Sequence, residues 1–143
     1  MKCTVIIDPD HDEEVIVYAH RSSRFTEAVR ALATEEDTEL IGYTEREGRR
    51  LSPNEVDCFV VEDECVYAIC ENERLRIKQR LYQLEEQLSD TFVRINQSCL
   101  VNLRRISRFD TSFSGSLRVT LKNGYTDFVS RRQVKYVKER LGL

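Results

Sequence analysis

The hydrophobic positions from residue 40 onward fall mainly into short runs that predict strands. These runs are rich in β-branched and aromatic side chains, which a pleated surface accommodates well. Residues 74–78 alternate between a basic and an apolar residue, which predicts a strand with one exposed basic face. The predicted strands are residues 40–44, 56–61, 66–70, 74–78, 92–95, 103–109, 117–122 and 125–129. Most of the chain is therefore expected to be β.

Two helices interrupt this pattern. One apolar face, with side chains three and four residues apart, predicts a helix in the middle of the domain: Ile77, Leu81, Leu84 and Leu88. A similar face predicts a C-terminal helix: Val134, Val137 and Leu141. Gly142 allows the left-handed turn that ends this second helix. The pattern from residue 39 to 143 thus predicts a β-rich α+β domain.

The start of the C-terminal helix carries an unexpected charge. Ser130 and Gln133 form a capping-box pattern, which predicts that the helix begins at Arg131. A cation at a helix N-terminus costs roughly 0.3 to 1 kcal/mol, yet Arg131 and Arg132 both lie there. Two interpretations stay open. Either the arginines are solvated and their cost is tolerated, or free amides and two guanidinium groups converge on a phosphate.

A second polar cluster follows the strand at residues 92–95. Asn96, Gln97 and Ser98 are residue types that favour caps and turns. They act either as a plain cap for the turn at residues 98–101 or as base contacts, because Asn and Gln can bind adenine N6 and N7 in the major groove.

A hairpin is predicted around Asn123-Gly124, which is typical of a two-residue turn with positive φ at both positions. Such a turn would place two pairs on the inner side of the hairpin: Val119 with Phe128, and Leu121 with Thr126.

Residues 1–38 predict a separate strand, strand, helix extension. The runs 4–8 and 14–19 are β-branched and flank a turn sequence, so they predict a hairpin. Ser22 or Ser23 can then cap a helix with a regular apolar spacing: Phe25, Val29 and Leu32. The acidic surface of this extension is either solvated or a surface for self-association or another partner.

Composition bounds the class of protein. The chain has 143 residues, with 41% hydrophobic and 33% charged, as in ordinary globular proteins. We find no apolar run of 18 residues and no signal peptide, so a cytoplasmic location is expected. The five cysteines include no C-x-x-C pair, so free thiols without a metal or other cofactor are expected. An enzyme is not expected, because the chain has no glycine-rich phosphate loop and no G-x-S-x-G motif.

Charge is divided unevenly along the chain, although the net charge is only −3. From Thr91 to the end there are eleven Lys and Arg against three Asp and Glu, a net of +8. The whole chain has 22 basic and 25 acidic residues, so the first ninety positions contain eleven basic and 22 acidic residues, a net charge of −11. A polyanion would be attracted to the second half only.

The two polar clusters lie within a recognisable frame. Residues 92–103, F-V-R-I-N-Q-S-C-L-V-N-L, and residues 121–135, L-K-N-G-Y-T-D-F-V-S-R-R-Q-V-K, resemble the LytTR DNA-binding domain of bacterial transcription regulators. The similarity covers roughly residues 40–143. With its short N-terminal extension, the chain resembles the small LytTR regulators that have no receiver domain and are often encoded beside a small membrane protein.

This resemblance implies elongated antiparallel sheets that bind double-stranded DNA through loops. It implies homodimers on direct repeats, with contacts in successive major grooves, and a small membrane protein as a further partner. By motif position, it implies DNA contacts at Asn96, Gln97, Ser98, Arg131, Arg132 and Lys135. Family members commonly add a third contact loop, but here it reads Glu62-Asp63-Glu64, which the DNA backbone repels, so we assign no contact there. The alternative is a module whose basic half binds an acidic partner, such as a loop of a membrane protein.

Overall fold

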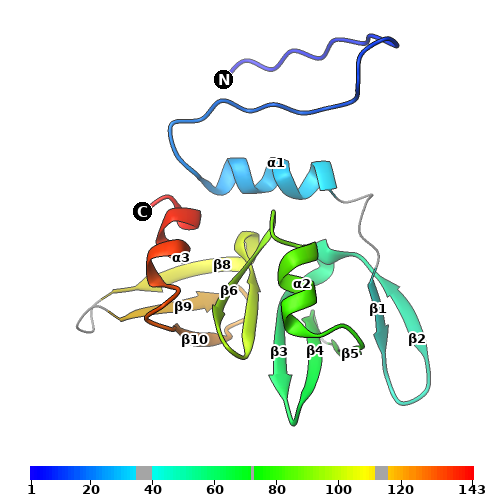
Figure 1. Ribbon diagram of the computed structural model, residues 1–143, viewed down its shortest axis with the longest axis vertical. Coiled ribbons are helices and arrows are strands. Elements are labelled where there is room, and N and C mark those ends of the chain that lie inside the picture. The colour runs from blue at the N-terminus through cyan, green and yellow to red at the C-terminus, as the bar shows by residue number, and fades with distance from the viewer. Residues whose placement is uncertain (35–39, 72, 112–115) are drawn as a thin grey trace.

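The computed structural model describes residues 1–34, 40–71, 73–111 and 116–143. Within these residues, two antiparallel sheets and three α-helices form the fold (Figure 1). The elements are α1 (Arg24–Thr34), β1 (Leu40–Tyr43), β2 (Gly48–Leu51), the 3-10 turn η1 (Pro53–Glu55), β3 (Val56–Glu62), β4 (Cys65–Cys70), β5 (Glu73–Ile77), α2 (Leu81–Gln87), β6 (Phe92–Asn96), β7 (Cys99–Asn102), the 3-10 turn η2 (Leu103–Arg105), β8 (Ile106–Asp110), β9 (Leu117–Leu121), β10 (Thr126–Val129) and α3 (Val134–Leu141).

The larger sheet has seven strands in the order β2-β1-β5-β4-β3-β7-β6, and the smaller has three in the order β10-β9-β8. One buried cluster joins Leu84 of α2 to Phe59 and Phe92 of the larger sheet. The ring centroids of the two phenylalanines lie 5.3 Å apart. A second buried cluster includes Val101 from the larger sheet, Val119 from the smaller sheet and Val137 from α3. The larger sheet is therefore covered on both faces, and α3 is held beside the smaller sheet.

The β-rich fold expected from the sequence is confirmed, with two strands that the pattern did not indicate. The sequence pattern predicted no strand at the position of β2, and it predicted a turn where β7 lies. All four residues of β7 are buried, and the strand pairs with both β3 and β6. Asn102 Nδ2 donates to Val56 O at 2.9 Å, so its polar side chain is satisfied inside the fold. Helix α2 begins at Leu81, while Ile77 ends the preceding strand.

The expected register of the last hairpin was wrong by one residue. Val119 pairs with Asp127 rather than Phe128, and the loop has three residues, because Leu121 N donates to Tyr125 O at 2.8 Å. In this loop Gly124 has φ of 93°. Since side chains alternate between faces, the shift leaves Phe128 53% exposed. Asn123, whose φ is not positive, donates to Asp57 Oδ2 at 3.2 Å, which ties the loop to β3.

The expected N-terminal hairpin was also wrong, whereas its helix is confirmed as α1. Residues 1–22 contain no strand or helix and lie beyond α1, away from both sheets (Figure 1). Two members of the apolar stripe expected on α1 are exposed, Phe25 at 46% and Leu32 at 65%, while Val29 is half-buried. The buried positions of α1 include Glu27 and Ala31 instead. The division of the chain at residue 38 stays a prediction, because residues 35–39 lie outside the described part.

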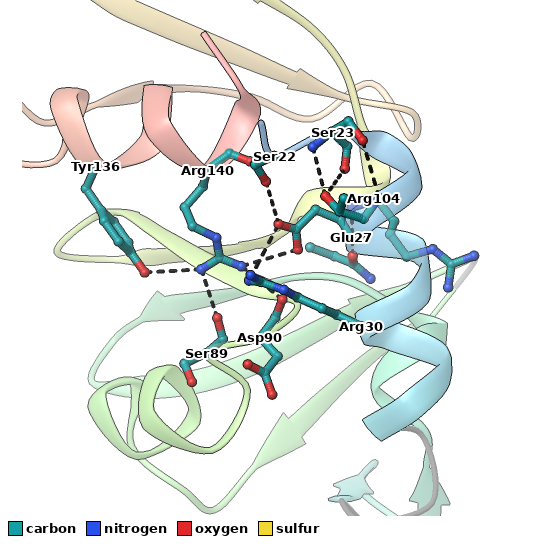
Figure 2. A network of polar contacts seen from close by, with 11 residues as sticks. Ser22, Ser23, Glu27, Arg30, Ser89, Asp90, Arg104, Tyr136 and Arg140 are labelled. Atoms are coloured by element: carbon teal, nitrogen blue, oxygen red, sulfur yellow. Dashed lines mark hydrogen bonds and ion pairs between the residues drawn. The ribbon is translucent and has the colours of Figure 1, made fainter. Parts of the chain in front are cut away.

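A buried ion pair attaches α1 to α3 (Figure 2). The Arg140 guanidinium lies 3.3 Å from Glu27 Oε2, and the two side chains are only 11% and 5% exposed. Arg140 also donates to the carbonyl oxygens of Ser89 and Asp90 at 2.8 and 2.9 Å. Ser22 Oγ lies 3.0 Å from the Arg140 carbonyl oxygen, so the start of α1 and the end of α3 are tied together.

Candidate nucleic-acid interface

The β6–β7 turn is built by the side chain of Asn96. Its Nδ2 donates to Asp127 Oδ2 and to the carbonyl oxygen of Phe128, both at 3.0 Å. Its Oδ1 accepts from the Ser98 amide at 2.9 Å. All these partners belong to the chain itself, so Asn96 joins the turn to β10. The prediction that Asn96 lies at a base edge stays untested, and its amide is already used within the turn.

Gln97 and Ser98 are exposed at the tip of this turn. Arg94 supports the turn from β6, since its Nε donates to Asn96 O at 3.1 Å and its guanidinium donates to Gln97 O at 2.9 Å. On the other side, the Val61 amide donates to Ser98 O at 2.9 Å. The sequence did not assign Arg94 to the site. Its position two residues before a polar turn is the signal that could have indicated this role.

Helix α3 begins later than the capping-box pattern indicated. It starts at Val134, and its N-cap Gln133 makes no side-chain capping hydrogen bond. Arg131 and Arg132 therefore lie in the preceding turn, which the bond from Gln133 N to Ser130 O closes at 2.9 Å. The first helical turn contains no acidic residue. The expected end of the helix is confirmed, since Gly142 has φ of 79°.

One backbone bond brings the two polar clusters together. The Ser130 amide donates to Ile95 O at 2.7 Å. Ser130 directly precedes Arg131, and Ile95 directly precedes Asn96. Together with the bonds from Asn96 to β10, this contact places the β6–β7 turn beside the turn that opens α3. Two segments some thirty positions apart in the sequence thus form one continuous surface.

The basic residues of the second half of the chain divide into two groups. Several arginines have carboxylate partners within the chain: Arg94 with Glu85, Arg105 with Asp57, Arg118 with Asp110 and Arg140 with Glu27. By contrast, Arg131, Arg132 and Lys135 are exposed, and within the described residues they make no side-chain hydrogen bond or ion pair. The cations available to an anionic ligand therefore include those at the start of α3.

An acidic turn borders this surface. The β3–β4 turn contains Asp63 and Glu64, with positive φ of 49° and 66°. The bond between Val61 and Ser98 places this turn at the same end of the larger sheet as the β6–β7 turn. Glu62 is paired with Arg74. The two remaining carboxylates would repel a phosphate backbone that approached this edge.

Metal-binding groups, membrane-spanning helices and reactive thiols were also considered for the described part of the chain. No group of three or more His, Cys, Asp or Glu residues is arranged to hold a metal ion. No helix there is long and apolar enough to cross a membrane. Cys58, Cys70 and Cys99 are buried and free. Burial raises the pKa of the Cys70 thiol to about 11, so this thiol is a poor nucleophile at neutral pH.

The chain is similar to known DNA-binding proteins. The family model of the LytTr DNA-binding domain matches residues 47–142. An uncharacterized HTH-type transcriptional regulator of Staphylococcus aureus is 31% identical over 146 residues, which cover 100% of this chain and 99% of the relative. Another from this species is 36% identical over 104 residues, which cover 73% and 71%.

The fold is also similar to a solved structure, the LytTr DNA-binding domain of a Bacillus cereus protein described as a methyl-accepting/DNA response regulator. The TM-score is 0.70 at 21% identity, and the match covers 75% of this chain and 99% of that one. The family model covers well over half of the chain, and the solved structure has the same fold. The chain belongs to the LytTR family of DNA-binding domains.

Proposed function

We propose that this protein is a sequence-specific transcription regulator that binds the major groove of double-stranded DNA through the β6–β7 turn and residues 130–135. The proposed contact residues are Asn96, Gln97, Ser98, Arg131, Arg132 and Lys135. The observation that carries the proposal is the pairing of these two turns through Asn96 and Ser130, beside cations that have no partner among the described residues.

Each residue has a role suited to its chemistry. Gln97 is exposed, and within the described chain its amide has no partner, so it can bind adenine N6 and N7. Asn96 shapes the turn that presents Gln97 and Ser98. Arg131 and Arg132 can bind either guanine O6 and N7 or a phosphate, because the guanidinium group presents two parallel donors. Lys135 lies in the first turn of α3, where the helix dipole also favours a phosphate.

Two copies are proposed to bind direct repeats as a homodimer on DNA. A half-site spacing of about one helical turn, roughly 10 base pairs, would place equivalent surfaces in successive major grooves. One surface made of two short turns reads few base pairs, so a second copy supplies the remaining affinity and specificity.

The test is binding to duplexes selected from random sequence, measured by fluorescence anisotropy. Arg132→Ala should weaken binding at least tenfold and leave the melting temperature unchanged, because the side chain is exposed and has no partner in the described structure. Arg46→Ala is the matched control: it removes one charge from the β1–β2 hairpin, at the opposite end of the larger sheet. Equal losses in both variants would show that only the net charge matters.

An acidic protein is the second candidate partner, because unpaired cations attract any polyanion. A cytoplasmic loop of a small membrane protein is one such partner. Titration of the same protein with duplex DNA and with an acidic peptide separates the two candidates. A DNA regulator should bind its selected duplex far more tightly than a scrambled duplex, whereas a general polyanion module should not distinguish them.

A further inference from the structure

Residues 1–21, which we call the arm, carry apolar side chains that the rest of the described chain does not cover. Val5, Ile6 and Ile7 are 77%, 80% and 88% exposed. Ile16 and Tyr18 in the second run are 63% and 94% exposed. Apolar side chains gathered at this density on a surface mark a site of association.

The backbone of the arm is also largely unpaired. Within the described residues, its one backbone–backbone hydrogen bond joins His11 N to Asp8 O at 3.3 Å, in the turn. The runs that flank this turn form no strand in the described structure, but both are β-branched, and the four consecutive apolar residues Val15 to Tyr18 favour a strand once a partner strand is present. A two-stranded hairpin alone is marginal in water. Strands of this kind need a further strand at their edge.

The second run lies along α1, although Val15 and Val17 are still 64% and 41% exposed. Val15, Val17 and Ala19 line a hollow of about 480 Å³ together with Val29 and Ala33 of α1. The alternating residues Ile16 and Tyr18 are left open, as is the edge of the run. The arm is therefore positioned along α1 with its hydrogen-bonding groups available to a partner.

We propose that the arm pairs with the arm of a second copy of this chain, antiparallel and centred on Val17. This register places the carboxylate of Glu13 opposite the guanidinium group of Arg21 of the second copy, and the twofold symmetry forms this pair twice. Opposite charges that face each other across antiparallel strands are stabilising. The order of charges along residues 13–21, acidic at one end and basic at the other, thus complements itself in the antiparallel direction.

The acidic residues of the arm disfavour anionic partners. The arm contains five acidic residues between positions 8 and 14, which repel nucleic acid and anionic membranes. Pairing of the arms would hold a second DNA-binding domain at high local concentration. The pairing itself does not depend on the proposed DNA surface.

The test is sedimentation velocity of the full chain over a range of concentrations. Glu13→Arg and Arg21→Glu each place like charges opposite one another at two symmetric positions, and each should weaken the dimer about fivefold or more. The double variant restores opposite charges and should return the dimer to within about twofold of the original. Glu45→Arg makes the same charge change in the β1–β2 hairpin and should leave the dimer unchanged.

A second variant tests the ladder itself. Val17→Pro removes an amide at the centre of the pairing and should abolish the dimer, while far-UV circular dichroism and binding to a single half-site stay unchanged. A chain that sediments as a monomer at every concentration would overturn the proposal. A dimer that survives Val17→Pro, or a double charge variant as weak as the single ones, would do the same.

Discussion

The buried pair between Glu27 and Arg140 should contribute measurably to stability, and Glu27→Gln tests this. The substitution keeps the shape of the side chain and its contact with Ser22, but it removes the charge that faces the guanidinium group (Figure 2). Arg140 would then remain buried with the carbonyl oxygens of Ser89 and Asp90 as its nearest acceptors. A guanidinium group without its carboxylate partner is costly in this setting.

The magnitude follows from the burial of both partners. Breaking a fully buried pair costs roughly 3–5 kcal/mol, and losing one hydrogen bond to a charged group costs roughly 1.5–3 kcal/mol. Because Arg140 keeps other acceptors, the lower range applies. We expect a loss of about 1.5–3 kcal/mol in the free energy of unfolding. For a chain of this length, that corresponds to a fall in melting temperature of about 5 to 10 °C.

Urea unfolding followed by circular dichroism measures this loss. Glu86→Gln, at an exposed position on α2, is the matched control and should change stability by less than about 0.5 kcal/mol. Arg140→Met and the double variant with Glu27→Gln complete a thermodynamic cycle, in which the double variant should lose less than the sum of the single losses. Additive losses, or a cost for Glu27→Gln no larger than that of the control, would refute the reasoning.

Three further predictions concern the turns and the thiols. Asn96→Ala should lower the free energy of unfolding by about 1–3 kcal/mol and also weaken DNA binding, because it removes the hydrogen bonds to β10. Gln97→Ala should weaken DNA binding alone. Urea unfolding and fluorescence anisotropy on both variants compare the two effects. Asparagine can adopt the φ of 49° at position 63, so Asp63→Asn should keep the turn and raise DNA affinity about twofold to fivefold at low salt. An unchanged DNA affinity would show that the acidic turn lies away from DNA. Burial raises the pKa of the Cys70 thiol to about 11 in the folded protein, whereas a thiol in an unfolded chain has a pKa of about 8.5. As the pH rises, the unfolded state therefore loses this proton first. The free energy of unfolding should fall between about pH 8.5 and 11. Unfolding curves across that range measure the fall, and replacing Cys70 by Ala should reduce it.

The sequence alone determined the features that depend on local pattern. Runs of β-branched residues indicated most strands, because a pleated surface favours these side chains wherever the strand lies. The spacing of Val134, Val137 and Leu141 indicated the buried face of α3, and Gly142 indicated its end. The candidate DNA-contacting residues were also proposed from the sequence, through its polar turn, its cluster of cations near the start of α3 and its family resemblance, and they stay a prediction.

The tertiary structure decided pairing, register and direction. The one-residue shift of the last hairpin lets Asn123 reach Asp57, a contact that local turn chemistry does not contain. Glu27 of α1 turns inward because it meets Arg140, 113 positions away, while Phe25 and Leu32 of the expected apolar stripe are exposed. Asn96 holds the two turns of the interface together through β10. These contacts join residues far apart in the chain, so no local pattern could specify them.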